Sequence, residues 1–428
     1  MSHPASPSSG ATRREFLAAA AAGAVALGSV PFVHAGGGDT LKIGLIGCGG
    51  RGTGAATQAL HADPNVKLVA LGDVFEDHLQ SSLGALRSDG EIAAKVDVKP
   101  DHCFLGFDAY KKVLATDVDV VILTTPPHFR PLHIKAAVEA DKHIFCEKPV
   151  AVDAPGVQSV VRSCAEAKKK NKAVVSGLCY RYQHAKRETM QRIHEGAVGD
   201  VVALQCTYNT GFLWSHPRQP GWSDMEWQMR NWLYFTWLSG DHNVEQHIHS
   251  LDKMMWAMKD APPKQCAGTG GRQVRTAAAF GNIFDHHCCV YEWADGVKLF
   301  ANCRQQDGCA SDVSDFVYGK KGTAEIMKHR IIGENAWASK INPKQDDMYQ
   351  NEHDELFASI RKGEPINNGD YMTRSTLMAI MGRMSTYTGQ VITWEMALNS
   401  KEDLTPAKYE FGEIATPPVA VPGVTKFV

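Results

Sequence analysis

An apolar segment that runs directly into a cluster of glycines constrains this chain more than any other feature. Leu41–Ile46 is followed by Gly47, Gly49 and Gly52, in the spacing Gly-x-Gly-x-x-Gly. A buried strand, a tight turn and a helix that begins within the glycine cluster produce this spacing. The next apolar segment, Val66–Asp73, ends in an acidic residue. This order predicts a strand–turn–helix–strand unit in which the two strands are parallel.

Short apolar segments continue to alternate with helical segments up to about residue 150. Residues 119–125 are apolar until Pro126 and Pro127 follow, and a helix predicted around residues 131–140 precedes a strand within residues 143–149. Continuous apolar strands are typical of parallel sheets that helices cover on both faces. The predicted fold class is therefore α/β, with an N-terminal Rossmann domain built on a doubly wound parallel sheet.

The composition changes after about residue 200. Residues 201–210, 288–293, 298–303 and 314–318 are of β type, and amphipathic helices are predicted at 352–362 and 371–387. These segments predict an α+β domain with a large, mostly antiparallel, open sheet. We expect a signal peptide at 1–35, the Rossmann domain at 36–160, the second domain at 161–400 and an extended tail at 401–428. The C-terminal helices are expected to pack back on the Rossmann domain.

The N-terminus has the three parts of an export signal. Arg13 and Arg14 precede an Ala-rich apolar segment, and Val33-His-Ala35 fits a small-residue cleavage site. The Arg-Arg-x-Phe-Leu pattern resembles twin-arginine signals, whose export machinery translocates folded proteins. The pattern predicts a soluble periplasmic or otherwise exported protein. No later apolar segment is long enough to predict a stable membrane anchor.

Composition excludes several classes of protein. The net charge of −2 provides no basic field, so we expect no nucleic-acid partner. Eleven cysteines without a Cys-x-x-Cys pair argue against a disulfide scaffold. Residues 286–289 (His-His-Cys-Cys) alternate between the two faces of a predicted strand. Asp241, His242 and His247 form a second possible group, but His247 and His249 are two residues apart and would diverge on a helix. We therefore expect no metal at either group.

The glycine loop predicts a dinucleotide site. Its glycines allow the tight turn and the close approach of a diphosphate to a helix N-terminus, which favours anions. Asp73, at the end of the second strand, is expected to accept hydrogen bonds from ribose hydroxyls and to repel a 2′-phosphate, so NAD is favoured over NADP. Arg51 could contact a phosphate, or it could be a solvated loop residue. The predicted cofactor contacts in the loop are Gly47, Gly49, Gly50, Arg51 and Gly52.

Three further motifs complete a family pattern, namely Thr124-Thr-Pro-Pro-His128 with His133, Glu147-Lys-Pro149, and Glu245-x-x-x-His249-x-x-Asp252. With the glycine loop, they resemble the Gfo/Idh/MocA oxidoreductases, which include glucose–fructose oxidoreductase and inositol dehydrogenase, over about residues 40–400. The resemblance implies that Lys148 lies beside the nicotinamide and contacts the reacting hydroxyl. It adds a set of expected cofactor contacts: Thr125, Pro126, His128, Glu147 and Lys148.

The resemblance also implies the acid–base residues. His249 matches the histidine that helps to remove the hydroxyl proton, and Glu245 matches an aspartate that binds or polarises the substrate. Four residues separate them, so they share a face of a helix. This chain departs from the family by having Glu in place of Asp, with one extra residue after Gly240. Lys148, His249 and Glu245 are therefore the predicted catalytic residues.

A carbohydrate substrate follows from the same resemblance. Five of the nine tryptophans lie in residues 212–237 and could form a stacking wall for a sugar, or a packed loop. Trp232, Arg181 and Tyr182 are added to Lys148, Glu245 and His249 as expected substrate contacts. A homodimer or homotetramer is implied by the resemblance alone.

The predicted function is an NAD(P)-dependent oxidoreductase acting on a CH–OH group of a sugar or polyol. Because free NAD is scarce outside the inner membrane, we expect the cofactor to be tightly bound. The alternative is a redox-neutral glycoside hydrolase or lyase that oxidises its sugar only transiently. A non-catalytic NAD-bound protein is a third possibility, against which the presence of both Lys148 and His249 argues.

Overall fold

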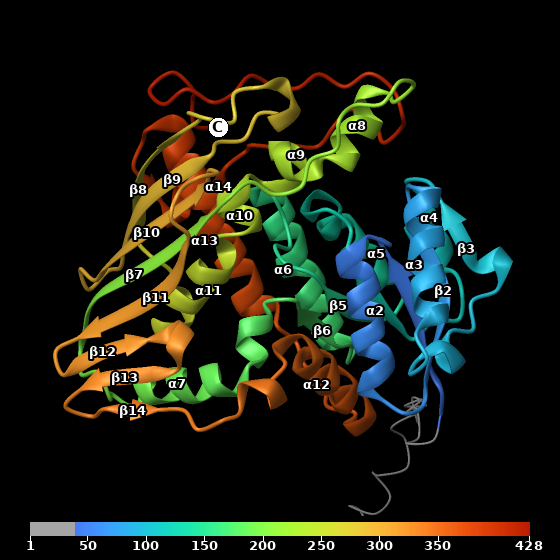
Figure 1. Cartoon of the computed structure of the whole chain (residues 1–428), viewed down its shortest axis with the longest axis horizontal. Helices are drawn as coiled ribbons and strands as arrows, with labels where there is room; N and C mark the ends of the chain where they lie inside the picture. Colours follow the sequence, from blue (N-terminus) through green and yellow to red (C-terminus); the bar gives the residue numbers. More distant parts are fainter. Residues whose placement is uncertain (1–38) are drawn as a thin grey trace, which may run out of the picture.

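The computed structural model describes residues 39–428, so the predicted signal peptide and its cleavage site lie outside the described residues. The chain forms two sheets on opposite sides of the molecule, with helices between them (Figure 1). The first sheet has the strand order β3-β2-β1-β4-β5-β6, and every pair in it is parallel. Its strands are β1 Leu41–Ile46, β2 Val66–Asp73, β3 Cys103–Leu105, β4 Val120–Leu123, β5 His143–Cys146 and β6 Val174–Ser176.

Helices cover both faces of this sheet, which explains why its central strands are apolar throughout. All four residues of β4 are buried, as expected for a strand without a solvent face. The helices are α2 Gly50–Ala62, α3 Glu76–Ser88, α4 Ala109–Leu114, α5 Arg130–Glu139 and α6 Ala154–Lys169. The Rossmann prediction is confirmed, and the sheet continues to β6, beyond the boundary expected at residue 160.

The second sheet has nine strands, in the order β14-β13-β12-β11-β7-β10-β9-β8-β15. Only β7 and β10 pair in parallel, so the prediction of a mostly antiparallel sheet is confirmed. Its strands are β7 Val201–Thr210, β8 Gln265–Gly271, β9 His286–Glu292, β10 Lys298–Gln305, β11 Asp312–Gly319, β12 Gly322–Glu325, β13 Arg330–Gly333, β14 Trp337–Ala338 and β15 Ile392–Thr393.

One face of this sheet packs on helices and the other is open. Along β10, Leu299 and Ala301 are buried, whereas Phe300 is 48% exposed, which is the period-two pattern of a half-covered strand. The covering helices are α11 (Ile248–Ala257) and α13 (Gly369–Thr388). The Tyr291 hydroxyl on β9 donates to the carbonyl of Met378 on α13, at 3.2 Å. These helices join the two sheets into one body (Figure 1).

The remaining helices complete the second domain and return to the first. They are α7 His184–His194, α8 Asp224–Arg230, α9 Thr236–Ser239, α10 His242–Glu245, α12 Met348–Lys362 and α14 Trp394–Asn399. Helix α12 packs against α2, because Gln350 donates to the carbonyl of Gln58 at 3.0 Å and Arg361 pairs with Asp63 at 2.8 Å. This is the return of a C-terminal helix to the Rossmann domain that the sequence suggested.

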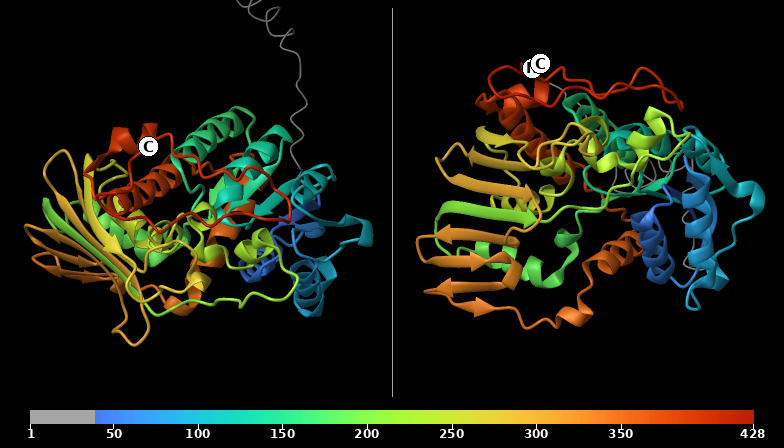
Figure 2. Two further views of the ribbon diagram at one scale, coloured as in Figure 1. Left: turned by 90° about the horizontal axis from the view of Figure 1, so that it is seen from above. Right: turned by 45° about the horizontal axis from the view of Figure 1, so that its top comes forward.

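The chain after residue 400 has no regular helix or strand, yet it packs along the molecule. It runs across the top of the protein past α9 and α8, and returns (red in Figures 1 and 2). Leu404, Tyr409 and Ile414 pack against a cluster of aromatic residues that includes Phe75 and Phe129. Among residues 39–428, no helix is both long and apolar enough to cross a bilayer.

Candidate active site

The carboxyl ends of the parallel strands bring the predicted cofactor residues together. Ligands of open α/β sheets bind at this edge, where the strand order reverses between β1 and β4. A cleft lies there, and the loops after β1, β2 and β4 line it. Gly47, Gly49, Asp73, Thr125, Pro126 and Trp232 line the cleft together with Val74, Phe75, His78, Phe107, Tyr110, Phe129, His133 and Met229.

Two glycines of the loop are required by close backbone contacts. Gly47 has φ +97°, and a Cβ atom there would lie 2.6 Å from the backbone nitrogen of Thr125. A Cβ on Gly52 would lie only 2.0 Å from the carbonyl oxygen of Gly47. By contrast, a Cβ on Gly49 would meet no atom within 4 Å, because this glycine faces the open cleft. The loop thus offers a helix N-terminus to an anion.

Asp73 lies beside this loop and is fixed by backbone donors. Its carboxylate accepts hydrogen bonds from the backbone N–H groups of Cys48 (2.5 Å) and Phe75 (2.8 Å). Burial nevertheless raises the pKa of Asp73, against the lowering effect of these bonds. A carboxylate held at the end of β2 is in the position where a Rossmann fold recognises ribose hydroxyls.

The other predicted cofactor residues have partners within the protein. Arg51 Nε lies 3.1 Å from Glu147 Oε1, and the Arg51 guanidinium sits 4.9 Å from the ring centre of Tyr349. The Thr125 hydroxyl lies 3.2 Å from His133 Nδ1, and His128 Nε2 lies 2.9 Å from the hydroxyl of Tyr409 in the C-terminal segment. Gly50 begins helix α2. That these residues contact a bound cofactor is still a prediction from the sequence.

Lys148 and Glu245, which are far apart in the sequence, meet directly. Lys148 Nζ donates to the carbonyl of Glu245 at 2.6 Å and to its Oε1 at 2.9 Å. The two side chains are 13% and 14% exposed, so the pair is largely shielded but reachable. Lys148 follows β5, and its peptide bond to Pro149 is cis. The family resemblance therefore selected two residues that the fold brings into contact.

His249 lies four residues after Glu245 but in the next helix. Because α10 ends at Glu245 and α11 begins at Ile248, the two residues do not share the face of one helix that the spacing predicted. The ring of His249 is half-buried and meets the ring of Tyr180 edge-on, with 5.3 Å between the ring centres, and its Nδ1 has no hydrogen-bond partner. Burial lowers the pKa of His249 well below its usual value, and the charges of Lys148 and Lys253 lower it further. A neutral imidazole beside a lysine and a carboxylate can accept a proton from a hydroxyl.

The structure does not support two of the predicted substrate contacts. Arg181 is buried, and its guanidinium pairs with Asp252 (2.8 Å) and Asp260 (2.6 Å). Tyr182 is also buried, and its hydroxyl donates to Asn368 at 2.7 Å. Both side chains turn inward because buried polar partners, supplied by distant segments, satisfy them. Trp232 lines the cofactor cleft instead, so its stacking on a sugar stays a prediction.

Several cleft residues escaped the sequence analysis. Phe75 and Phe107 follow β2 and β3, and Met229 comes from α8 in the second domain. No spacing rule links these positions, since apolar residues after strands are common in any α/β protein. Only Phe75, two residues after Asp73, carried a local signal. The cleft is closed by a side chain from the second domain, which a one-domain motif cannot reveal.

Fold and site together define a nicotinamide-dependent oxidoreductase, and comparison with known proteins supports this class. Residues 41–177 match the Gfo/Idh/MocA family, described as an oxidoreductase family with an NAD-binding Rossmann fold. This match and the inositol dehydrogenase relatives support a Gfo/Idh/MocA family oxidoreductase.

Individual relatives are distant. An inositol 2-dehydrogenase from Serratia proteamaculans is 26% identical over 295 residues, which cover 67% of this chain and 74% of the relative. A 2,7-anhydro-N-acetylneuraminate hydratase from Mediterraneibacter gnavus is 27% identical over 187 residues, covering 41% and 46%. The crystal structure of an aldose-aldose oxidoreductase from Caulobacter crescentus, complexed with glycerol, has the same fold. Its TM-score is 0.64 at 19% identity, covering 83% of this chain and 99% of that one.

Acid is expected to destabilise the fold through buried neutral histidines such as His353. This residue is fully buried behind the glycine loop, and burial lowers its pKa to about 3, helped by the charge of Arg51. The unfolded chain binds the same proton near the ordinary value of 6.5. Below that pH the unfolded state takes up the proton and the folded state does not, so stability falls by about 1.4 kcal/mol per pH unit.

Denaturant titrations at pH 7, 6 and 5 measure this slope. In the variant His353→Leu, the slope of the free energy of unfolding against pH should decrease by up to the contribution of one histidine. Stability above pH 7 should stay largely unchanged. His216→Leu removes a histidine that is exposed and serves as the matched control. An unchanged slope in His353→Leu would contradict the prediction.

Proposed function

We propose that this protein oxidises a CH–OH group of a sugar or polyol with a tightly held NAD. The observation that carries the proposal is the contact of Lys148 with Glu245, together with a half-buried His249 that is near enough for the Lys148 charge to lower its pKa. The family and the inositol 2-dehydrogenase relative support the choice of a polyhydroxylated substrate.

Each residue of the site has a distinct task in this proposal. Lys148 Nζ donates a hydrogen bond to the reacting hydroxyl oxygen, while Glu245 Oε1 and the Glu245 carbonyl fix the position of that ammonium group. His249, kept neutral by burial, accepts the hydroxyl proton. The nicotinamide, when bound, supplies the acceptor for the hydride. Stabilisation of the developing alkoxide therefore comes from Lys148, and removal of its proton from His249.

Retention of the cofactor is supported by a C-terminal strap, which we define as residues 404–416. Phe411 stacks on Phe75 (5.9 Å between ring centres) and contacts Phe107 (5.4 Å), and both of these rings line the cleft. Tyr409 contacts the Phe129 ring at 5.6 Å. The strap braces three walls of the cofactor cleft from outside, so opening the cleft requires these contacts to break.

Weakening the strap is expected to release NAD faster. In the double variant Tyr409→Ser/Phe411→Ser, loss of the ring contacts costs about 1–2 kcal/mol, which corresponds to roughly a tenfold higher dissociation rate. The rate is measured from protein-bound NAD remaining after gel filtration at successive times. Val424→Ser changes an exposed apolar residue of the same tail outside the strap and is the control. Equal retention in all three proteins would contradict the role of the strap.

The location and assembly of the protein are parts of the same proposal. The Arg-Arg-x-Phe-Leu segment supports export by the twin-arginine machinery to the periplasm. A homodimer or homotetramer is supported by apolar residues on the open face of the second sheet. Phe300 and Ile332 are each about half exposed there. Light scattering on the mature chain tests the assembly, and fractionation of expressing cells tests the export.

A redox-neutral reaction is the second candidate. The similarity to a hydratase favours it, because adding water changes no oxidation state overall. In this reaction the sugar would first be oxidised by NAD, and an elimination or hydration would follow. The hydride would then be returned from the cofactor to the sugar. The same three residues would serve both reactions, so the site itself does not choose between them.

One experiment separates the candidates. The mature chain is purified without added cofactor, and the absorbance of reduced nicotinamide is followed after addition of free sugars, polyols or aryl glycosides. A lasting increase with a free sugar or polyol supports net oxidation by bound NAD. Release of the aryl group without a lasting increase supports the redox-neutral reaction. Failure of every compound, with NAD present in the protein, would overturn the substrate class.

A further inference from the structure

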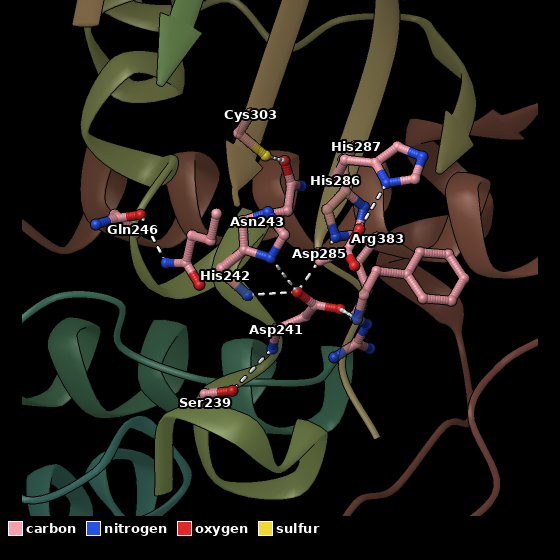
Figure 3. A network of polar contacts seen from close by, with 12 residues as sticks. Ser239, Asp241, His242, Asn243, Gln246, Asp285, His286, His287, Cys303 and Arg383 are labelled. Carbon is pink, nitrogen blue, oxygen red and sulfur yellow. Dashed lines mark hydrogen bonds and ion pairs between the residues drawn. The ribbon is translucent and has the colours of Figure 1, made fainter. Parts of the chain in front are cut away.

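Three buried side chains meet at the turn that precedes α10, the helix that ends at Glu245. Asp241, His242 and His287 offer ligand atoms that all lie within 4.8 Å of one another, and each side chain is at most 3% exposed. Asp241 has φ +78°, which is uncommon for a residue other than glycine. Figure 3 shows its carboxylate at the centre of the network.

The sequence had placed these residues in two separate groups. The first contained Asp241, His242 and His247, and the second was His286-His-Cys-Cys289. In the structure, His247 turns away to Asn243 (3.0 Å), while His287 on β9 reaches Asp241 (3.2 Å). Two residues of the first group and one residue of the second therefore form one cluster, which the spacing along the chain could not show.

The contact between His242 and Asp241 has the geometry of two ligands rather than of a hydrogen bond. His242 Nδ1 lies 2.8 Å from Asp241 Oδ1 in a geometry that is poor for a hydrogen bond, and His242 Nε2 has no partner. A buried imidazole left without partners costs about 1–3 kcal/mol. Two atoms bound to one tetrahedral ion lie about 3 Å apart with their lone pairs directed at the ion. That arrangement explains both the short approach and the missing bond.

The surroundings of the cluster resemble the outer shell of a metal site. His287 Nδ1 lies 2.9 Å from the hydroxyl of Thr386, which donates to the carbonyl of Arg383 at 3.0 Å. A hydroxyl that donates in this way accepts from Nδ1–H, and His287 Nε2 then presents its lone pair toward Asp241. Metal-bound histidines are usually oriented by such a bond from the second ring nitrogen.

Asp241 is anchored in the same manner. Its Oδ2 accepts from the hydroxyl of Tyr387 (2.5 Å) and from the backbone of Phe284 (2.9 Å). Its Oδ1 accepts from the backbone of His242 (2.5 Å) and is the atom that faces both rings. The carboxylate is thereby fixed with one oxygen directed at the two histidines.

We propose that Asp241, His242 and His287 bind one divalent transition-metal ion, with zinc as the best match. Two imidazoles on one tetrahedral ion place their ring centres about 5 Å apart, and those of His242 and His287 are 4.8 Å apart.

The site is structural in this proposal. All three ligands are closed to solvent, so a substrate could not reach the ion. The ion would tie the start of α10 to β9 and to the segment of α13 that holds Thr386 and Tyr387. Because α10 ends at Glu245, the ion fixes the turn from which this residue reaches Lys148. The competing arrangement, which we call the proton network, contains no metal and only hydrogen bonds. In it, His287 Nε2–H donates to Asp241 and His242 stays unpartnered.

Metal analysis of the intact protein tests the proposal. The mature chain is expressed in zinc-supplemented medium with a tag free of histidine, passed through a weak chelator, and measured by elemental mass spectrometry. About one zinc per chain is expected in the wild type. His286→Asn should retain it, because this half-exposed neighbour pairs with Asp285. His242→Asn and His287→Asn should lose at least nine-tenths of it.

A second measurement uses only the wild-type chain, so it tests the proposal even if the variants fail to fold. On the wild-type chain, a strong chelator should lower the thermal midpoint, and zinc or cobalt(II) should restore it. Bound cobalt should also show the visible absorption of tetrahedral coordination. A wild-type protein with only background metal, and a midpoint that neither chelator nor zinc changes, would overturn the proposal in favour of the proton network.

Discussion

Replacing Lys148 by methionine is expected to lower kcat by about 10³-fold with the best substrate found. A positioned group that contributes to proton transfer is worth about 10²–10⁴-fold. Methionine has a similar length but cannot donate a hydrogen bond to the reacting oxygen. It also leaves Glu245, whose Oε1 lies 2.9 Å from Lys148 Nζ, without its cationic partner. The loss should appear in kcat rather than in the affinity for NAD.

The controls for this variant separate chemistry from folding. Lys168→Met changes an exposed lysine of α6 and should retain full activity. The variant Glu245→Gln keeps a hydrogen-bond acceptor for Lys148 and should lose less than Lys148→Met. Bound NAD, measured after denaturation, should be equal in all of these proteins. If Lys148→Met kept more than a tenth of the wild-type kcat, Lys148 could not be the group that contacts the reacting hydroxyl.

Much of the Rossmann domain was predictable because its signals are local. The glycine spacing, the apolar strands and the acidic end of β2 each depend on residues within a few positions of one another. Strands β2 and β7 were predicted with the bounds that the structure gives, since both are continuous segments of strand-forming residues.

The site was predictable only where a family motif supplied what the local sequence lacks. No residue near Lys148 predicts its contact with Glu245, which is 97 residues away. Only the family resemblance assigned the two residues to one site. Arg181 was misassigned because its partners, Asp252 and Asp260, come from a different helix and its following loop. A polar residue after a strand can face a pocket or a buried ion pair, and the sequence does not distinguish the two.

Neither the strap nor the Asp241 cluster could be predicted from the sequence, for the same reason. The tail looked like an extended segment because it has no periodic pattern, and its aromatic residues find partners only in the folded molecule. His287 shared a strand with three other potential ligands, and only the register of β9 decides which of them points inward. Long-range pairing therefore determined what the local patterns left open.

Replacing Gly52 by alanine is expected to weaken NAD binding by at least about 100-fold and to destabilise the protein. The new Cβ would lie 2.0 Å from the carbonyl oxygen of Gly47, and both atoms belong to rigid elements. Reaching an ordinary contact distance requires helix α2 to move more than about 1 Å from the loop, which withdraws its N-terminus from the diphosphate. Losing hydrogen bonds to a charged group at about 1.5–3 kcal/mol each lowers affinity by about 10²-fold. Calorimetric titration of the NAD-free protein and thermal unfolding measure the two effects.

Gly49→Ala separates the cofactor contribution from the packing contribution. Its Cβ meets no protein atom within 4 Å, so the folded protein without NAD should keep its stability. If the diphosphate lies against Gly49, the same methyl group occupies its place and affinity should still fall at least tenfold. Gly84→Ala, in an open position of α3, should leave NAD affinity unchanged. If Gly49→Ala bound NAD normally while Gly52→Ala did not, the loop would shape the helix without contacting the diphosphate at Gly49. Loss of affinity in both variants, with loss of stability in only one, is the result that the glycine geometry predicts.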